Sequence, residues 1–358
     1  METKSQRGID RVNPACTIPD LAAQITAALV GNASALGLGD VRSTSCPSNI
    51  ALVIGTSGTT GMSKEVAFTS NALLSSARAS NKYLNAQAGQ VWSLFLPLTH
   101  IAAVNVILRS MELGTLPIDL RDYEGEYPKV DFTSIVPTQL FRALNGDDRL
   151  LRHLQHAQAV LVGGAALSAT LRNQAQTQKI NVVETYGMTE TSGGCIYNGE
   201  ALEGVEYSIN EHGLVQIRGS VMSQTYLNAP ELYRLSEGWF ITNDLGEVIN
   251  GKLNILGRAD DVIISGGENI SLTGIEATLS IRYPEIEFAA FAVNDIQWGH
   301  ALHLAVVGEI NESEILHYLE AALGSASKPK GIHHLESIPL LGIGKTDRKA
   351  LAKMVGHE

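Results

Sequence analysis

Short apolar runs alternate with amphipathic stretches of helical length between about residue 50 and residue 184. The apolar runs predict strands over residues 51–54, 91–96, 115–118, 132–136, 159–163 and 180–184. The stretches between them predict helices over residues 70–86, 101–112, 138–144 and 167–178. This alternation is typical of βαβ units and of a mostly parallel sheet. Residues 1–47 lack it, so we expect an irregular segment there, with one amphipathic helix near Leu21–Leu36.

The pattern changes after about residue 204. Short strands predicted over residues 213–219, 239–241 and 253–256 indicate a β-rich module, and a charged turn follows at 257–261. Beyond the turn, the pattern predicts strands over residues 262–264, 287–294 and 301–307 and helices over residues 273–281 and 312–323. The sequence therefore predicts an α/β fold with two domains. Residues 1–257 form a large N-terminal domain with mostly parallel sheets and the β-rich module, and residues 258–358 form a small α+β domain.

The composition limits the partners of the chain. Its 358 residues are 44% apolar, which suits a globular protein of two domains. A net charge of -11 argues against general affinity for nucleic acid, so local lysines and arginines must meet any anionic substrate. Cys16, Cys46 and Cys195 lack metal-binding spacing and cannot all pair, which favours a reducing compartment. Without a signal peptide or a long apolar span, we expect a cytoplasmic protein that does not insert into membranes; no oligomeric state is predicted.

A loop rich in hydroxyl groups follows the predicted strand at 51–54. It reads Thr56-Ser57-Gly58-Thr59-Thr60-Gly61-Met62-Ser63-Lys64. Its glycines allow close backbone approach, and its hydroxyls and lysine face no opposing acid, so the loop suits a polyphosphate. The alternative is a polar surface loop. It is not a Walker A loop, because Lys64 follows serine rather than glycine, and Gly344-Lys345-Thr346 fails the same motif because Pro339 replaces its first glycine.

Four further motifs follow this loop in order. They read Tyr-Gly-Met-Thr-Glu-Thr at 186–191, Trp-Phe-Ile-Thr-Asn-Asp at 239–244, Gly-Arg-Ala-Asp-Asp-Val-Ile-Ile-Ser-Gly-Gly-Glu-Asn at 257–269 and Gly-Ile-Gly-Lys-Thr-Asp-Arg at 342–348. With the loop at 56–64, this set resembles the adenylate-forming superfamily of acyl-CoA synthetases, luciferases and peptide-synthetase adenylation domains. The resemblance covers roughly residues 50–358.

Three features are similar to one branch of this superfamily, the short actinobacterial o-succinylbenzoate–CoA ligases of menaquinone synthesis. The phosphate loop lies near the N-terminus, the run 185–195 ends in Ser-Gly-Gly-Cys, and Pro97-Leu98-Thr99-His100 precedes Arg109 by nine residues. The resemblance implies an AMP-forming ligase that uses ATP, Mg²⁺ and CoA and forms an acyl-adenylate. Two alternatives stay open: a CoA ligase for another aryl or short-chain acid, and a non-catalytic nucleotide-binding protein.

The resemblance also implies residues that hold the nucleotide and the metal. Thr189 would contact the α-phosphate, and Glu190 would bind Mg²⁺, for which one carboxylate with phosphate oxygens and water is a usual site. Asp244 would accept the ribose hydroxyls beside Arg258. The other implied nucleotide contacts are Thr56, Ser57, Gly58, Thr59, Thr60 and Lys64 of the loop and Gly164, Ala165, Tyr186 and Gly187 around the adenine. The alternatives are a solvated Glu190, a core Tyr186 and a charged exposed turn at Asp244 and Arg258.

The acid is assigned to a different set of residues. His100 would gate its tunnel, with Ser192, Gly193 and Gly194 beside it, and Lys345 would neutralise charge on the α-phosphate during adenylation. Arg109 lies in an otherwise apolar or small stretch, where a guanidinium is costly to bury unless an anion meets it. The second carboxylate of o-succinylbenzoate would meet that need, and an internal ion pair is the alternative. A pocket shared by His100 and Arg109 requires the helix to begin after His100.

The last implied residues concern CoA and domain motion. Ser265, Gly266 and Gly267 resemble the loop along which pantetheine passes, and Asp260 aligns with the hinge of a mobile C-terminal domain. The chain departs from the usual motifs at a few positions: Ser63 and Leu272 replace prolines, Asn243 replaces a glycine and Gly274 replaces a glutamate. These changes affect the fine geometry that the resemblance implies.

Overall fold

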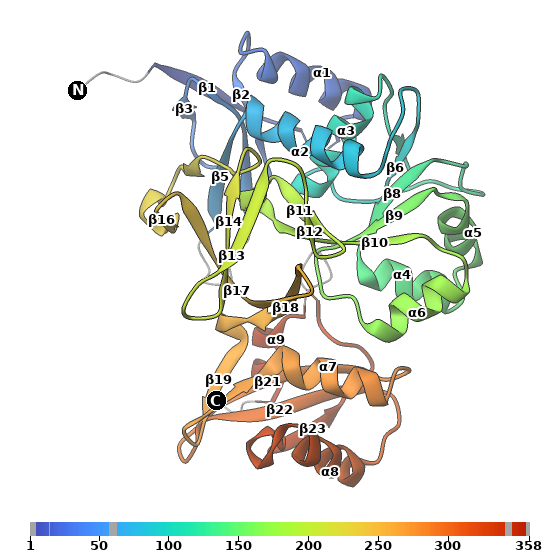
Figure 1. Ribbon diagram of the computed structural model, residues 1–358, viewed down its shortest axis with the longest axis vertical. Coiled ribbons are helices and arrows are strands. Elements are labelled where there is room, and N and C mark those ends of the chain that lie inside the picture. The colour runs from blue at the N-terminus through green and yellow to red at the C-terminus, as the bar shows by residue number, and fades with distance from the viewer. Residues whose placement is uncertain (1–4, 14, 57–62, 341–345, 356–358) are drawn as a thin grey trace. The chain divides into compact units, whose positions relative to one another are not determined.

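The computed structural model describes residues 5–13, 15–56, 63–340 and 346–355. The chain forms two compact units, and Figure 1 labels the elements of both. The large unit comprises Met1–Gly164, Ala175–Ser208 and Gln216–Thr242, and the small unit comprises Ala165–Gln174, Ile209–Val215 and Asn243–Glu358. Helices and sheets are mixed along the chain, which confirms the predicted α/β class. The predicted domain boundary after residue 257 stays a prediction.

The first sheet of the large unit is built mainly from the N-terminal quarter of the chain. In spatial order its strands are β15 (Thr225–Tyr226), β5 (Lys64–Thr69), β4 (Ile50–Thr56), β2 (Ala35–Leu38), β1 (Gln6–Arg11) and β3 (Ser45–Pro47). The pairs β1–β2 and β2–β4 are parallel, whereas β4–β5, β5–β15 and β1–β3 are antiparallel. This sheet is therefore mixed rather than mostly parallel.

The expectation of an irregular segment over residues 1–47 is wrong, because β1, β2 and β3 all lie within it. The helix predicted near Leu21–Leu36 is α1, Ile18–Leu29, which begins after the N-cap Thr17 and ends before Gly31. Residues 35–38 are a strand, and all four are buried. A short apolar run of this kind has no periodicity that separates a buried strand from the end of a helix, which explains the error.

The second sheet of the large unit confirms the predicted parallel arrangement. Its order is β12 (Glu200–Ala201), β11 (Gly193–Tyr197), β10 (Val182–Met188), β9 (Ala159–Val162), β8 (Phe132–Ile135), β6 (Trp92–Leu94) and β7 (Ile118–Asp119). Every pair from β7 to β10 is parallel, and β11 and β12 add antiparallel strands at one edge.

Helices separate and cover these two sheets. α2 (Ser70–Tyr83) contacts β4 and β5 on one side and β11 on the other, beside α3 (Ile101–Glu112), so the pair lies between the sheets (Figure 1). α4 (Pro137–Leu144), α5 (Asp148–His156) and α6 (Ala169–Thr177) follow strands of the second sheet. α5 was not predicted, since only Leu150, His153 and Leu154 of its nine residues are buried.

The β-rich module predicted after residue 204 is present as a third sheet. Its order is β13 (Val205–Ile209), β14 (Leu214–Gly219), β17 (Trp239–Ile249) and β16 (Leu235–Ser236), and β18 (Lys252–Arg258) also pairs with β17. The short 3₁₀ helices η1 (Thr189–Thr191), η2 (Pro230–Leu232) and η3 (Ala259–Asp261) lie at turns.

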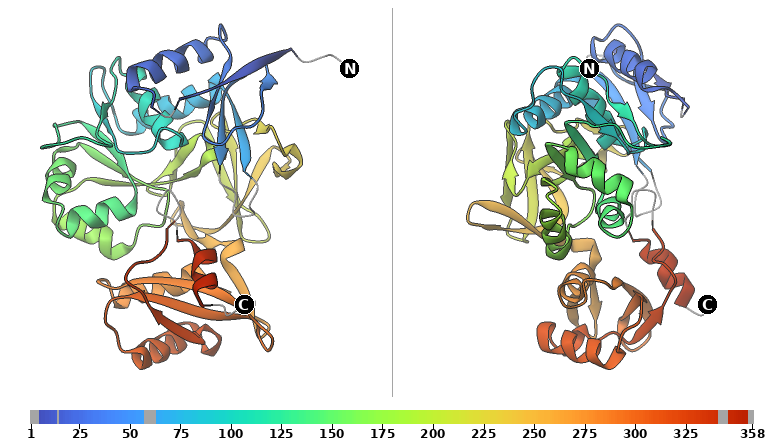
Figure 2. Two further views of the ribbon diagram at one scale, coloured as in Figure 1. Left: turned by 180° about the vertical axis from the view of Figure 1, so that it is seen from behind. Right: turned by 90° about the vertical axis from the view of Figure 1, so that its right-hand side faces the viewer.

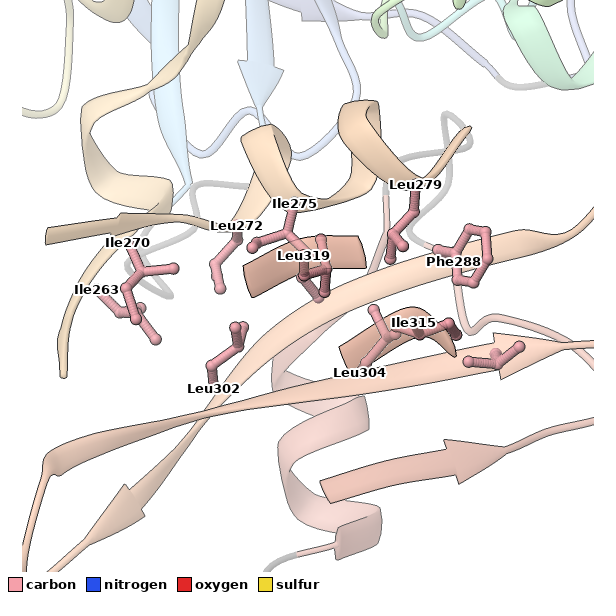
Figure 3. Packing of buried hydrophobic residues seen from close by; sticks show 12 residues of the cluster. Ile263, Ile270, Leu272, Ile275, Leu279, Phe288, Leu302, Leu304, Ile315 and Leu319 are labelled. Carbon is pink, nitrogen blue, oxygen red and sulfur yellow. The ribbon is translucent and has the colours of Figure 1, made fainter. Parts of the chain in front are cut away.

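The small unit contains a sheet with a core on each face. Its strands are β20 (Glu268–Ser271), β19 (Val262–Ser265), β22 (Gly299–Val307) and β21 (Glu287–Asp295), in that order, with β23 (Gly331–His334) parallel to β22. α7 (Leu272–Arg282) and α8 (Glu312–Leu323), with η4 (Ser325–Ser327) after them, cover one face, whose core includes Leu304 and Leu319 (Figure 3). α9 (Arg348–Val355) covers the opposite face (Figure 2). No helix within the described ranges is both long and apolar enough to cross a membrane.

Candidate functional site

The hydroxyl-rich loop lies between two antiparallel strands. β4 ends at Thr56 and β5 begins at Lys64; these residues face each other, and the Thr56 hydroxyl donates to the Lys64 carbonyl over 3.3 Å. A Walker A loop instead joins a strand to a helix, so the arrangement agrees with the exclusion of that motif. Residues 57–62 lie outside the described residues, so the predicted contacts of Ser57, Gly58, Thr59 and Thr60 stay predictions.

Lys64 and Glu190 come from distant motifs, and Tyr226 contacts both. Lys64 Nζ lies 4.7 Å from the centroid of the Tyr226 ring. The Tyr226 hydroxyl donates to Glu190 Oε1 over 2.5 Å, so a cation would bind through the other carboxylate oxygen. Burial and the Glu190 charge raise the pKa of Tyr226 well above its usual value, so Tyr226 remains a protonated donor. Tyr226 was not predicted as a site residue, because only the pairing of β15 with β5 brings it here.

The turn that carries Glu190 is tightly packed. Ser192 has φ 52°, a left-handed conformation that is uncommon for a residue other than glycine. Its carbonyl accepts from Asn105 Nδ2 at 2.5 Å and from Ser76 Oγ at 3.1 Å, so both central helices hold the turn. A Cβ atom on Gly187 would lie 2.1 Å from the Gly193 carbonyl oxygen, so Gly187 must be glycine.

The residues predicted to line the adenine lie near the carboxyl ends of two neighbouring parallel strands. Val162 at the end of β9 faces Glu184 in β10, so Gly164 and Tyr186 both lie at the carboxyl edge of this pair. Gly164 has φ 85°, and a Cβ on the preceding Gly163 would lie 2.2 Å from Thr185 Oγ1. Ligands of α/β sheets bind at such edges. Ala165, the other predicted adenine contact, belongs to the small unit.

α3 carries both residues assigned to the acid. The helix begins at Ile101, one residue after His100, as a pocket shared with Arg109 requires. His100 is half-buried with extended backbone at the N-cap, and burial lowers its pKa, so its imidazole is neutral at pH 7. Arg109 lies in the last turn and is only 4% exposed.

In the described chain, the side chains that contact the Arg109 guanidinium are aromatic rather than acidic. Arg109 Nη2 donates to the Tyr197 hydroxyl over 3.0 Å, and its guanidinium carbon lies 5.1 Å from the centroid of the Trp92 ring. Burial lowers the pKa of Arg109. Among the described residues no carboxylate forms an ion pair with it, and its Nε and the Nε1 of Trp92 are both buried without a hydrogen-bond partner. Two neighbouring buried donors without acceptors fit a carboxylate group.

In the small unit, Asp244 and Arg258 face each other across the β17–β18 pair. Arg258 Nη1 lies 3.4 Å from Asp244 Oδ1, while its Nε and Nη2 each donate to Asp260 over 2.7 Å. The hydrogen bonds that Arg258 donates to Asp260 raise the pKa of Arg258. The Arg258 guanidinium therefore contacts both Asp244, its predicted partner at the ribose, and Asp260, the predicted hinge residue.

The predicted CoA loop lies in the same unit, between β19 and β20. Gly266 and Gly267 have φ 60° and 89°, and the Gly266 N–H donates to the Trp298 carbonyl over 3.1 Å. A Cβ on Gly266 would lie 2.7 Å from the Trp298 ring, so this turn requires glycine. Ser265 is buried. Lys345 lies outside the described residues, so its predicted role stays a prediction.

Within the described ranges, no three His, Cys, Asp or Glu side chains cluster as metal ligands. One carboxylate, Glu190, with a nucleotide's phosphate oxygens and water would suit Mg²⁺, which needs few protein ligands. Lys64, which contacts the same tyrosine, would supply a positive charge for those phosphates.

The chain is similar to known enzymes over most of its length. A family model described as AMP-binding enzyme matches residues 8–221. A probable 2-succinylbenzoate–CoA ligase from Mycobacterium tuberculosis is 35% identical over 331 residues, which cover 87% of this chain and 86% of that protein. The structure of E. coli MenE with a bound analogue of OSB-AMS is 26% identical, with a TM-score of 0.69, over 96% of this chain and 81% of that one.

The fold agrees with a further solved structure. o-Succinylbenzoate CoA synthetase (MenE) from Bacillus subtilis, in complex with the acyl-adenylate intermediate OSB-AMP, has a TM-score of 0.75 at 24% identity, over 96% of this chain and 78% of that one. The chain belongs to the AMP-binding enzyme family, which confirms the adenylate-forming resemblance of its motifs. Relatives that it matches over most of its length include proteins named 2-succinylbenzoate–CoA ligase or probable 2-succinylbenzoate–CoA ligase.

Tyr226→Phe should weaken binding of Mg·ATP more than binding of ATP without Mg²⁺. The variant keeps the ring beside Lys64 but removes the donor that orients Glu190, a contact worth about 1–3 kcal/mol for a charged acceptor. Calorimetric titration with ATP, with and without Mg²⁺, measures the difference. Tyr233→Phe is the control, because its hydroxyl donates to the Ser223 carbonyl instead. Equal losses under both conditions would mean that Tyr226 does not act through Glu190.

Proposed function

We propose that this chain is an AMP-forming ligase that converts o-succinylbenzoate and CoA to o-succinylbenzoyl-CoA in menaquinone synthesis. ATP and the acid first give an acyl-adenylate and pyrophosphate, and CoA then replaces AMP. The named relatives and the family match support this activity. Adenylation turns a poor leaving group into a good one, so the reaction needs no side-chain nucleophile.

The observation that carries the choice of acid is the burial of Arg109 without an acidic partner among the described residues. An uncompensated buried cation is unfavourable unless a ligand supplies the anion. o-Succinylbenzoate has two carboxylates, one to be activated and one for Arg109. Arg109 Nε and Trp92 Nε1 give that second carboxylate two donors that nothing else in the described chain satisfies.

The other residues receive roles in the same reaction. Lys64 and the loop from Thr56 to Thr60 hold the phosphates, and Thr189 contacts the α-phosphate. Mg²⁺, when bound through Glu190, supplies positive charge to the phosphate oxygens. Lys345 neutralises the charge that develops on the α-phosphate in the transition state. A neutral His100 beside the tunnel of the acid adds no positive charge that would compete with Arg109 for a carboxylate.

Thioester formation requires a second pose of the C-terminal domain, residues 258–358. Asp260, at the turn η3 between β18 and β19, is the hinge, and Ser265, Gly266 and Gly267 guide pantetheine toward the adenylate. A rotation of this kind is absorbed by a few residues at the ends of elements.

The activity is tested by supplying the protein with o-succinylbenzoate, ATP, Mg²⁺ and CoA. We expect o-succinylbenzoyl-CoA, AMP and pyrophosphate, and weaker activity with benzoate, which lacks the second carboxylate. A preference for acids with one carboxylate would indicate a CoA ligase of another specificity. ATP binding without ATP–pyrophosphate exchange for any acid would indicate a non-catalytic nucleotide-binding protein.

Arg109→Ala should lower kcat/KM for o-succinylbenzoate while the KM for ATP stays unchanged. Loss of a buried charged contact is worth about 2–5 kcal/mol, so the decrease should be roughly 30-fold or more. Arg109→Lys keeps the charge but loses the paired donors of the guanidinium, so its kcat/KM should lie between those of the wild type and Arg109→Ala. Steady-state kinetics on variants with normal melting profiles measures this. An unchanged KM for the acid would exclude Arg109 as its carboxylate partner.

Asp260→Pro should retain part of the adenylation activity and lose CoA transfer. Proline fixes φ near -65°, so the hinge keeps one pose. The substitution also removes the ion pair with Arg258, and Asp260→Ala, which removes that pair without fixing φ, is the matched control. Single-turnover pyrophosphate release and thioester yield, compared for both variants, separate the two effects. If proline and alanine reduce both steps equally, Asp260 is not the pivot.

A further inference from the structure

A chain of hydrogen bonds at Arg109 joins three elements of the large unit. Arg109 Nη2, on α3, donates to the hydroxyl of Tyr197 at the end of β11 over 3.0 Å. That hydroxyl lies 2.8 Å from Ser80 Oγ on α2, and the two hydroxyls share a hydrogen bond. Asn81, the next residue of α2, donates from Nδ2 to the Arg109 carbonyl over 3.0 Å. Both the side chain and the backbone of Arg109 are therefore held from outside its own helix.

These contacts are closed to solvent, since Tyr197 and Ser80 are both fully buried beside the buried Arg109. A buried donor that loses its acceptor finds no water to replace it. Within the described residues, the Tyr197 hydroxyl is the one recorded acceptor for the Arg109 side chain. The Trp92 ring attracts the same cation, but a ring face does not fix the direction of an N–H group as a hydrogen bond does. Tyr197 therefore sets the direction in which the guanidinium points.

The same helix and strand are also joined near the residues assigned to the nucleotide. Asn105, about one helical turn before Arg109 on α3, donates to the carbonyl of Ser192, which directly precedes β11. Hydrogen bonds from α3 therefore hold β11 at both of its ends. Glu190, which is assigned to Mg²⁺, lies two residues before Ser192 in the same turn. The separation between that turn and the guanidinium is thus fixed by contacts between α3 and β11.

We propose that Tyr197 is a positioning residue that makes the enzyme select acids by the spacing of their two carboxylates. Its hydroxyl holds the Arg109 guanidinium at a fixed separation from the site where the other carboxylate is activated. The inference rests on the proposed function, in which Arg109 binds the second carboxylate of o-succinylbenzoate. A fixed guanidinium suits one spacing, because hydrogen bonds weaken steeply when their geometry is poor. Without the Tyr197 hydroxyl, Arg109 Nη2 would be free to turn toward a carboxylate at another position.

The test compares two acids in the Tyr197→Phe variant, which keeps the ring and loses the hydroxyl. The acids are o-succinylbenzoate and o-glutarylbenzoate, whose side chain is one methylene group longer. The wild type should prefer the first acid by about 10-fold or more in kcat/KM, a usual effect of one methylene group in a fitted site. In Tyr197→Phe this preference should fall by roughly 10-fold, the effect of one hydrogen bond to a charged group, while the KM for ATP stays within about 2-fold.

Two further variants and one background complete the comparison. Tyr83→Phe is the matched control, because the Tyr83 ring lies edge-on to the Tyr197 ring at 5.2 Å but its hydroxyl accepts from Asn198. It should leave the preference unchanged. Ser80→Ala removes the second hydrogen bond of the Tyr197 hydroxyl; it should also lower the preference, and it serves if Tyr197→Phe does not fold. In the Arg109→Ala background, Tyr197→Phe should change the preference no further, because residues that act as a unit are not additive.

The outcomes separate this inference from the proposed function. A wild-type chain that forms no thioester from o-succinylbenzoate would overturn the function itself. A wild type that uses both acids equally well, or folded Tyr197→Phe and Ser80→Ala variants that keep the wild-type preference, would overturn the inference alone. Equal losses with both acids, or a further change of the preference in the Arg109→Ala background, would show that Tyr197 only stabilises the large unit and would also overturn the inference.

Discussion

The turn between β10 and β11 is the constraint on which the large unit depends. Ser192 is held there in a left-handed conformation by two helices, and Gly187 allows the backbone of the two strands to meet. Glu190 lies on one side of this turn, beside Tyr226, and Tyr197 lies at the end of β11, against Arg109. A displacement of the turn would therefore move the residues assigned to the nucleotide and those assigned to the acid together.

Electrostatics in this acidic chain depends on a few well-placed cations. The net charge is -11, yet Lys64 and Arg109 each lie against an aromatic ring. An aromatic face stabilises a cation without neutralising it, whereas a carboxylate would occupy the donors that a ligand needs. Arg258 differs, because its guanidinium forms ion pairs with both Asp260 and Asp244. In the proposed function, Lys64 and Arg109 serve ligands, whereas Arg258 also pairs with two carboxylates of the protein.

The sequence predicted what depends on local pattern and ordered motifs. The parallel strands and α3 follow from periodicity, and the family follows from five motifs. Long-range contacts were not predictable: Tyr226 reaches Glu190 only because β15 pairs with β5, and Tyr197 reaches Arg109 only because β11 packs against α3. The strands before residue 47 were missed because short, fully buried runs such as Ala35–Leu38 carry no alternation.

The two-sided sheet of the small unit has a consequence for the end of the chain. Along β21, Phe288 and Ala290 pack toward α7 and α8, whereas Ala289 and Phe291 pack toward α9. Leu351 of α9 packs on the second face, so α9 is part of a hydrophobic core. A truncation before Arg348 would expose a continuous apolar sheet face to solvent, and such faces promote aggregation. Shortened versions of this protein, or tags that displace α9, should therefore lose solubility before they lose catalytic activity.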